Sequence, residues 1–241
     1  FVESKNTKET IADSILMNEL FNNFVYSDFE GYLELPTNDY VIEVRDDAGT
    51  TTVASYDAPL ATLGLQGASA VVVASGFLNP ANNSNGAGFG LWVALPSGGN
   101  LIPLPTSTAK IQVIHNSADA AASTVDVYLN GGLAIDDFAF RTATPFIDVP
   151  AGVQISVAIA PSTSTSVSDA IATFNYSLVS GEKYVIVANG IVSPSGYTPA
   201  IPFDLHVFAG GRESATTSTN TDLLVCHGST DAPAVSVWET G

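Results

Sequence analysis

The chain has 241 residues, enough for two domains of ordinary size. Hydrophobic residues make up 46% and charged residues 13%, and 24 Asp+Glu against 7 Lys+Arg give a formal charge of −17. Such a surface repels nucleic acid and anionic lipid, and no apolar stretch reaches the roughly 18 residues of a membrane span, so we expect neither nucleic-acid binding nor membrane insertion.

In chain order, the first predicted element is a short amphipathic helix over about residues 10–22. Apolar residues recur there at the spacing of one helix face: Ile11, Ile15, Leu16 and Leu20. We expect this helix to be an insertion between two strands, lying against its own domain or a neighbour. Ile15 and Leu16 are therefore expected at an assembly interface.

After residue 20 nearly every segment has the pattern of a β-strand or a turn, because short apolar runs are separated by Gly, Pro, Asn and Ser. The predicted strands include Tyr40–Val44, Val71–Gly76, Ile111–His115, Val125–Leu129, Phe146–Val149, Val153–Ile159, Ala172–Leu178, Tyr184–Asn189 and Phe203–Phe208. The alternation in Val125–Leu129 predicts that Asp126 and Tyr128 face solvent. About seven strands in roughly 110 residues favour an all-β fold of two tandem immunoglobulin-like antiparallel β-sandwiches.

A repeated motif divides the chain. Val113–Ala120 reads Val-Ile-His-Asn-Ser-Ala-Asp-Ala, and Val225–Ala232 reads Val-Cys-His-Gly-Ser-Thr-Asp-Ala. In the same way Val71–Gly76 is the counterpart of Val185–Gly190. We therefore expect a first domain over residues 1–108, a complete domain over 109–221, and the first two strands of a further copy in 222–241.

In this division the first domain lacks its opening strands, and residues 222–241 carry strands of that kind. Burying their apolar side chains is worth on the order of 10 kcal/mol before ordering costs. The segment folds back onto its own first domain, enters a neighbouring copy, or belongs to one period of a longer polypeptide. We favour open head-to-tail continuity, covalent or not. Besides Ile15 and Leu16, the expected interface residues are Leu223, Val225, Val235, Val237, Trp238, Tyr26 and Tyr32.

The repeated His-x-Ser-x-Asp has the residue types of a hydrolase triad, as His115, Ser117 and Asp119 and again as His227, Ser229 and Asp231. A working triad brings its groups together from separate parts of a fold, which three alternating residues of one stretch do not do. We expect Ser and Asp to satisfy backbone N–H groups in a turn, with His hydrogen-bonded beside them. The protein is therefore not expected to be an enzyme.

Oxygen ligands for Ca²⁺ occur in Asp46-Asp47, Asp136-Asp137 and the loop Asn79–Gly88. None has the spaced acidic pattern of a calcium loop, so solvated turns are favoured, and we expect no metal or other cofactor. Cys226 stands where the first copy of the motif has Ile114, and we expect it to be a buried apolar residue in a strand.

The motif Val-x-His-x-Ser-x-Asp-Ala, followed by an alternating Val-x-Val and a Leu-Pro turn, resembles the bacterial secreted modules catalogued as domain of unknown function 4397. The stretches that match most closely are Val225–Glu239, Gly31–Asp47, Ala58–Leu63 and Val72–Pro80. The resemblance covers nearly the whole chain, twice, and departs from the family at Ala121, where the family has Pro. It implies extracellular, tandemly repeated β-sandwiches and supplies no catalytic residues.

These observations predict a structural subunit or repeat of an extracellular bacterial filament or surface stalk, secreted or on the cell surface. Its expected partners are copies of itself, joined head to tail by strand complementation or by chain continuity. The alternative is an extracellular carbohydrate- or ligand-binding adhesion module. In that case the loops Asn79–Phe89 and Pro194–Pro202 and the aromatic residues Tyr197 and Trp238 bind surface glycans.

Overall fold

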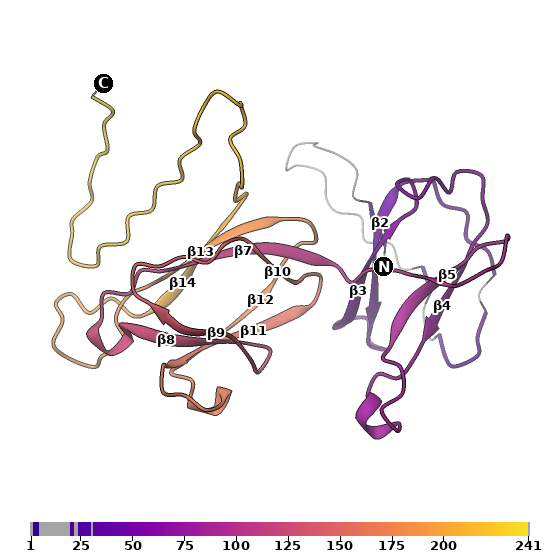
Figure 1. Ribbon diagram of the computed structural model, residues 1–241, viewed down its shortest axis with the longest axis horizontal. Helices are drawn as coiled ribbons and strands as arrows, with labels where there is room; N and C mark the ends of the chain where they lie inside the picture. The colour runs from indigo at the N-terminus through magenta and orange to yellow at the C-terminus, as the bar shows by residue number, and fades with distance from the viewer. Residues whose placement is uncertain (1, 5–19, 22–23, 30, 241) are drawn as a thin grey trace. The chain divides into compact units, whose positions relative to one another are not determined.

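The computed structural model describes residues 2–4, 20–21, 24–29 and 31–240 (Figure 1). The chain divides into two compact units: unit 1 comprises Phe1–Thr108 with Pro150–Val153, and unit 2 comprises Ala109–Val149 with Gln154–Gly241. The predicted helix, with Ile15 and Leu16, lies outside the described residues. In the remainder the secondary structure is strands and short 3-10 helices, so the all-β prediction is confirmed.

Unit 2 contains two four-stranded sheets, in the orders β10-β7-β13-β14 and β12-β11-β8-β9. The strands are β7 (Thr108–His115), β8 (Thr124–Leu129), β9 (Gly132–Ala139), β10 (Ile147–Pro150), β11 (Gln154–Pro161), β12 (Ala172–Ser177), β13 (Lys183–Asn189) and β14 (Asp204–Ala209). The 3-10 helices η2 (Ala120–Ala122) and η3 (Val167–Asp169) lie in the connections. Most pairs are antiparallel, as expected, but β7 and β13 are parallel.

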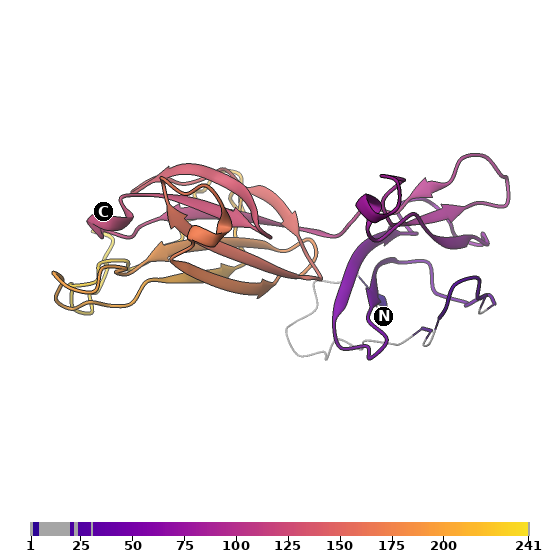
Figure 2. The same cartoon turned by 90° about the horizontal axis from the view of Figure 1, so that it is seen from below.

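The two sheets of unit 2 face each other as two layers (Figure 2). Alternate apolar residues point inward, because side chains on a strand alternate between its faces. A small apolar cavity of about 40 Å³ between the layers is lined from one sheet by Val113 and Ile186 and from the other by Val127 and Val157. This shared lining places one core between the sheets, which is the arrangement of a β-sandwich.

The outer face of strand β8 is covered. Asp126 and Tyr128 are only 1% and 4% exposed, so the prediction that they face solvent was wrong. The connection between β11 and β12 covers them: Tyr128 Oη and Ser164 Oγ are 2.8 Å apart, and Ser164 Oγ donates to Asp126 Oδ2 at 2.5 Å. Ala170, in the same connection, packs against the cluster of buried residues to which Tyr128 belongs.

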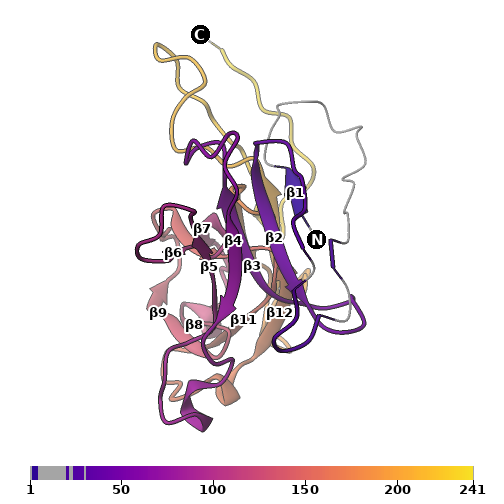
Figure 3. The ribbon, with the colours of Figure 1, turned by 90° about the vertical axis from the view of Figure 1, so that its right-hand side faces the viewer.

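Unit 1 contains two three-stranded sheets in the described residues (Figure 3). One has the order β1 (Val2–Ser4), β2 (Asp39–Arg45), β3 (Thr52–Pro59), and the other β4 (Val71–Ser75), β5 (Gly90–Ala94), β6 (Ile102–Pro103). The 3-10 helix η1 (Pro80–Asn82) lies between β4 and β5. The core of unit 1 is formed by Tyr40, Tyr56, Ala58, Leu91, Val93 and Leu104. Among the described residues no helix has the length and apolar character needed to cross a membrane.

The loop after β4 in unit 1 and the loop after β13 in unit 2 have the same backbone course. Each begins at a glycine of positive φ, Gly76 at +93° and Gly190 at +95°. A Cβ at these positions would lie 2.1 Å from the carbonyl oxygen of Gly88 and 2.3 Å from that of Pro202, so only glycine fits. The next residues form equivalent parallel bridges, Phe77 with Gly88 and Ile191 with Pro202. The residues of β4 and its loop therefore correspond one to one with those of β13 and its loop.

Candidate assembly site

The first copy of the repeated motif begins at the end of β7 with His115, which is 1% exposed. Its Nε2 lies 2.7 Å from the carbonyl oxygen of Ala122, and its Nδ1 accepts the N–H of Ser117 at 3.4 Å. This pair of contacts requires a proton on Nε2 and a lone pair on Nδ1, which is the neutral imidazole. Burial lowers the pKa of His115, and the hydrogen bond to Ala122 only partly opposes this.

Ser117 connects the motif to the end of β13. Its side chain is fully buried, and its Oγ donates to the carbonyl oxygen of Gly190 at 2.6 Å. The neighbouring Asn116 N–H donates to the carbonyl oxygen of Ala188 at 2.8 Å. We expected the serine to accept backbone N–H groups; instead it donates to a backbone carbonyl, because Gly190 turns its oxygen towards β7.

Asp119 holds the loop that follows β13. Its Oδ2 accepts the N–H groups of Val192 and Ser193 at 2.9 and 2.6 Å. Its Oδ1 accepts Ser193 Oγ at 2.8 Å, Tyr197 Oη at 3.0 Å and the N–H of Ala121 at 2.9 Å. The expectation that this aspartate satisfies backbone N–H groups is confirmed.

The carboxylate of Asp119 is held in its ionised form although it is 1% exposed. Burial acts to raise its pKa, but the hydrogen bonds from Ala121, Ser193 and Tyr197 outweigh burial and lower the pKa from 3.8 to about 2. Hydrogen bonds of this kind stabilise the charged form. In this arrangement the side chain of His115 bonds to Ala122, those of Ser117 and Asp119 bond to the turn and loop after β13, and the three side chains do not bond to one another.

The second copy of the motif lies in residues 222–240, here called the C-terminal segment. These residues form no strand (Figure 1). His227 Nε2 lies 3.2 Å from the carbonyl oxygen of Pro233, a local contact of the kind that His115 makes. Ser229 Oγ donates to Asp231 Oδ1 at 3.0 Å, and all three side chains are exposed. The motif is the same, but the partners that bury its first copy are missing.

The predicted interface residues that the structure describes are all exposed. Their exposed fractions are Leu223 82%, Val225 70%, Val235 60%, Val237 78%, Trp238 81%, Tyr26 98% and Tyr32 81%. Cys226 is a free, exposed cysteine, so its predicted burial in a strand is wrong for this chain. A strand needs a neighbour for its backbone hydrogen bonds, and the C-terminal segment has none in the described structure.

The apolar residues of strand β4 are exposed, whereas the corresponding residues of β13 are buried. Val71, Val72 and Val73 are 40%, 49% and 37% exposed, whereas Val185, Ile186 and Val187 are 7%, 4% and 8% exposed. β13 lies between β7 and β14, but among the described residues β4 pairs only with β5. Our interface prediction omitted β4. The signal that could have found it was the match of Val71–Gly76 to Val185–Gly190.

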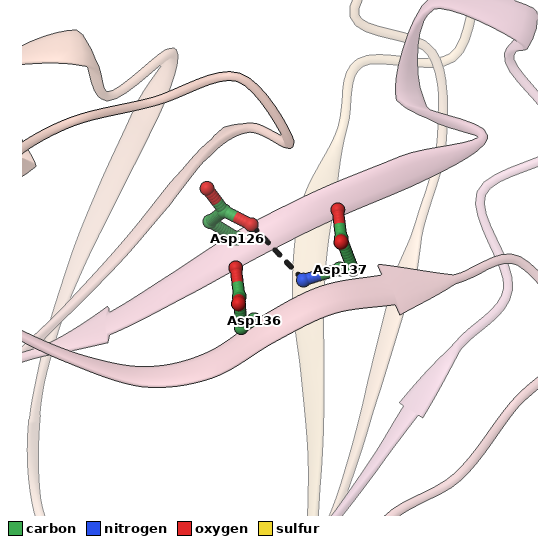
Figure 4. A group of neighbouring side chains, drawn as sticks. All are labelled: Asp126, Asp136 and Asp137. Atoms are coloured by element: carbon green, nitrogen blue, oxygen red, sulfur yellow. Dashed lines mark hydrogen bonds between the residues drawn. The ribbon is translucent and has the colours of Figure 1, made fainter.

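Three carboxylates gather on β8 and β9 of unit 2 (Figure 4). Oxygen atoms of Asp126, Asp136 and Asp137 lie within 4.8 Å of one another. Asp126 Oδ1 accepts the N–H of Asp137 at 3.1 Å, and its Oδ2 accepts Ser164 Oγ. Asp136-Asp137 was a candidate from the sequence, and Asp126 was not. Protein hydrogen bonds account for the position of Asp126, and nothing in the cluster points to a cation.

The other predicted oxygen-rich turns are held by their own hydrogen bonds. Asp46 Oδ1 accepts the N–H groups of Thr51 and Thr50, and these bonds lower the pKa of Asp46. In the loop Asn79–Gly88, Asn79 precedes η1, and its Oδ1 accepts the N–H of Asn82 at the end of η1. Both turns have side-chain-to-backbone bonds of the kind that Asp and Asn commonly make in turns.

Residues 105–238 match the family described as domain of unknown function (DUF4397), and no curated protein matches the chain. The matched region is more than half of the chain, and it contains both copies of the repeated motif. The closest resemblances in unit 1, such as Gly31–Asp47 and Val72–Pro80, lie outside it. On this match, the chain belongs to the DUF4397 family of unknown function.

Proposed function

We propose that this protein is a structural subunit or repeat of an extracellular bacterial filament or surface stalk. Its β-sandwich domains are immunoglobulin-like and follow one another in tandem. The copies are joined head to tail through the C-terminal segment, by strand complementation or by chain continuity. One observation carries the proposal: residues of β4 are exposed where those of β13 are buried, and the chain holds an exposed second copy of the β7 sequence.

The exposed strand of unit 1 favours a partner strand. An apolar strand with an unpaired edge is a template for pairing with another chain. Burying a fully exposed valine side chain contributes about 1.5–3 kcal/mol, and Val71, Val72, Val73 and Val225 are 40%, 49%, 37% and 70% exposed. Ordering the backbone of the segment costs about 1–2 kcal/mol per residue, and a ladder of hydrogen bonds along β4 offsets part of this cost. Apolar burial and the ladder together favour the C-terminal segment as the partner of β4.

The contact proposed here joins two different surfaces, the C-terminal segment and unit 1. A contact between unlike surfaces that does not close into a ring extends into a fibre. The formal charge of −17 acts against side-by-side clumping of copies, so the strand contact is left as the specific one. Chain continuity gives the same order of domains, because the C-terminal segment of one repeat then pairs with unit 1 of the next repeat.

The extracellular setting follows from the family resemblance. A structural role in place of an enzymatic one is supported by the motif itself. Of the side chains that would form a triad, Ser117 and Asp119 instead hold the end of β13 and its loop, and His115 bonds to the carbonyl oxygen of Ala122. The function proposed for this motif is to fasten one strand to another.

The test is the concentration dependence of assembly. The purified chain is expected to form particles of increasing mass in sedimentation velocity and filaments in electron micrographs. Val225→Asp is expected to remain at 24.9 kDa, while Val179→Asp, at an exposed valine of unit 2, assembles like the unaltered chain. An unaltered chain that stays a compact monomer at every concentration would refute the head-to-tail role.

Denaturing electrophoresis of the native material separates the two kinds of continuity. A filament held by strand complementation is expected to collapse to 24.9 kDa. A covalent series of repeats is expected to stay at a multiple of that mass. Either band pattern fits a head-to-tail series, and the mass decides which one is present.

A further inference from the structure

We infer that the C-terminal segment docks on β4 of a second copy, in the parallel register that β7 takes on β13, and that Ser229 and Asp231 fasten it to the loop 76–79 of that copy. This inference rests on the proposed function and specifies its contact residue by residue. It is carried by the correspondence of β4 with β13 and by the two states of the repeated motif.

The register comes from unit 2. There β7 and β13 pair in parallel, with Val113 opposite Ile186 and Ile114 opposite Val187. The pairing ends where Gly190 turns away and the motif crosses to the loop. Since Gly76 repeats that turn with the same φ and the same close carbonyl, the end of β4 fixes the same stopping point for an incoming strand.

Transferred to the second copy, the register makes specific pairs. The segment residue Val225 lies opposite Val72, and Cys226 lies opposite Val73. All four side chains are exposed in the free chain. Adjacent strands lie about 4.8 Å apart, so the pair Cys226 and Val73 falls within the Cα separation that a disulfide can bridge.

The loop after β4 offers the groups that the motif requires. In unit 2, Asp119 accepts the N–H groups of Val192 and Ser193, and Ser117 donates to Gly190. In unit 1 the corresponding groups are the N–H groups of Leu78 and Asn79 and the carbonyl oxygen of Gly76. Within the described part of the chain none of these three groups has a hydrogen-bond partner. The loop 76–79 therefore presents two donors and one acceptor at the positions that correspond to the partners of Asp119 and Ser117 in unit 2.

In the second motif the side chains of Ser229 and Asp231 bond to each other, and among the described residues no strand or loop of another element holds them. Ser229 donates to Asp231, a bond absent between Ser117 and Asp119 in the docked first copy, where each contacts the loop instead. The contact of His227 with Pro233 is already formed, as His115 has with Ala122. Docking therefore exchanges the Ser229–Asp231 bond, and the bond that Gly228 accepts from Asn116 Nδ2, for several bonds to the loop of the second copy.

Cross-linking through the native cysteine tests the register. In Val73→Cys, oxidation is expected to give a ladder of covalent multiples of 24.9 kDa on a non-reducing denaturing gel. Val71→Cys is the matched control, because Val71 lies opposite Leu224 in this register, two residues from Cys226. It is expected to link at least about 10-fold more slowly, since a disulfide requires a close Cα pair.

The outcomes separate the inference from the function. If the unaltered chain assembles but Val73→Cys links no faster than Val71→Cys, the register is wrong and the head-to-tail role stands. If the link forms only within single chains, the second copy is not the occupant, and the head-to-tail role fails with it. A ladder of multiples that depends on Val73→Cys supports both.

The fastening residues are tested by weakening them. Asp231→Ala and Ser229→Ala are each expected to reduce association by at least about 10-fold, since each removes bonds to the loop 76–79 of the second copy. Thr230→Ala is the control, because it introduces the residue that the first motif has at Ala118. Circular dichroism should be unchanged in all three, since these side chains lie outside the strands. Equal association of Asp231→Ala and the unaltered chain would refute the fastening role.

Discussion

The two copies of the His-x-Ser-x-Asp motif differ in their surroundings and not in their sequence. At residues 115–119 every side chain of the motif is buried and bonded; at 227–231 the same side chains are exposed, and Ser229 bonds to Asp231. The first copy lies beside a strand, β13, that ends at a glycine turn and is followed by two N–H groups that donate to Asp119. In the described structure the second copy has no such strand beside it. The motif therefore supplies one side of a hydrogen-bonded contact, and the loop after a strand such as β13 supplies the other side.

Strands β4 and β13 show the same difference from the opposite side. Both are Val-rich, both end at a glycine of positive φ, and both pair with an antiparallel partner. Only β13 has a second neighbour among the described residues, and only β13 is buried. Burial of such a strand is thus decided by the strand beside it, not by its own composition.

The largest expected effect separates these two strands. Val187→Asp places a carboxylate in β13 at a side chain that is 8% exposed, and we expect it to lower the free energy of unfolding of unit 2 by more than about 4 kcal/mol. Val73→Asp changes an exposed residue of β4 and is expected to cost less than about 1 kcal/mol in the dilute chain. Urea unfolding of monomers measures both, and similar losses would show that β4 is as buried as β13.

The next effect separates the two motifs. Asp119→Ala leaves the N–H groups of Val192 and Ser193 and the hydroxyl of Tyr197 without their acceptor, and we expect a loss of about 3 kcal/mol. Asp231→Ala is expected to lower the stability of the monomer by less than about 0.5 kcal/mol, because its side chain is exposed. Both are measured by urea unfolding at dilutions where the chain is monomeric. A loss of more than about 1 kcal/mol for Asp231→Ala would mean that the second motif is already docked.

The stability that Asp119 contributes is also expected to depend on pH. The pKa of Asp119 is about 2 in the folded chain against 3.8 ordinarily, so the folded state binds this proton more weakly than the unfolded state. The stabilisation is complete above pH 4 and is lost as the pH falls towards 2, by about 2 kcal/mol. Asp119→Asn should lose less stability over this range than the unaltered chain. If the two pH profiles run parallel, the ionised carboxylate is not the source.

Much of this fold could be predicted from the sequence, because strands are recognised by alternating apolar and polar residues and by the Gly, Pro and Asn between them. The strands Tyr184–Asn189 and Phe203–Phe208 were found within a residue or two. Alternation reports which residues share a face but not what covers that face, so the burial of Asp126 and Tyr128 by the connection at Ser164 was missed. That Asp119 accepts backbone N–H groups was predicted, but not that two of them, on Val192 and Ser193, belong to the loop after β13, because a backbone N–H group leaves no mark on residue type.

The smallest effect is spectroscopic, and it follows the C-terminal segment directly. After the two motifs, Val-Asp-Val-Tyr at 125–128 corresponds to Val-Ser-Val-Trp at 235–238, so Trp238 is the counterpart of Tyr128. Tyr128 is 4% exposed, but Trp238 is 81% exposed. With the only other tryptophan removed by Trp92→Phe, we expect the emission of Trp238 to move to shorter wavelength as the concentration rises, and its quenching by acrylamide to fall. Adding Val225→Asp should hold the emission at its dilute position, because the segment then stays in solvent. An emission that does not change while particles form would place Trp238 outside the contact, and the part of the segment that docks would then end before it.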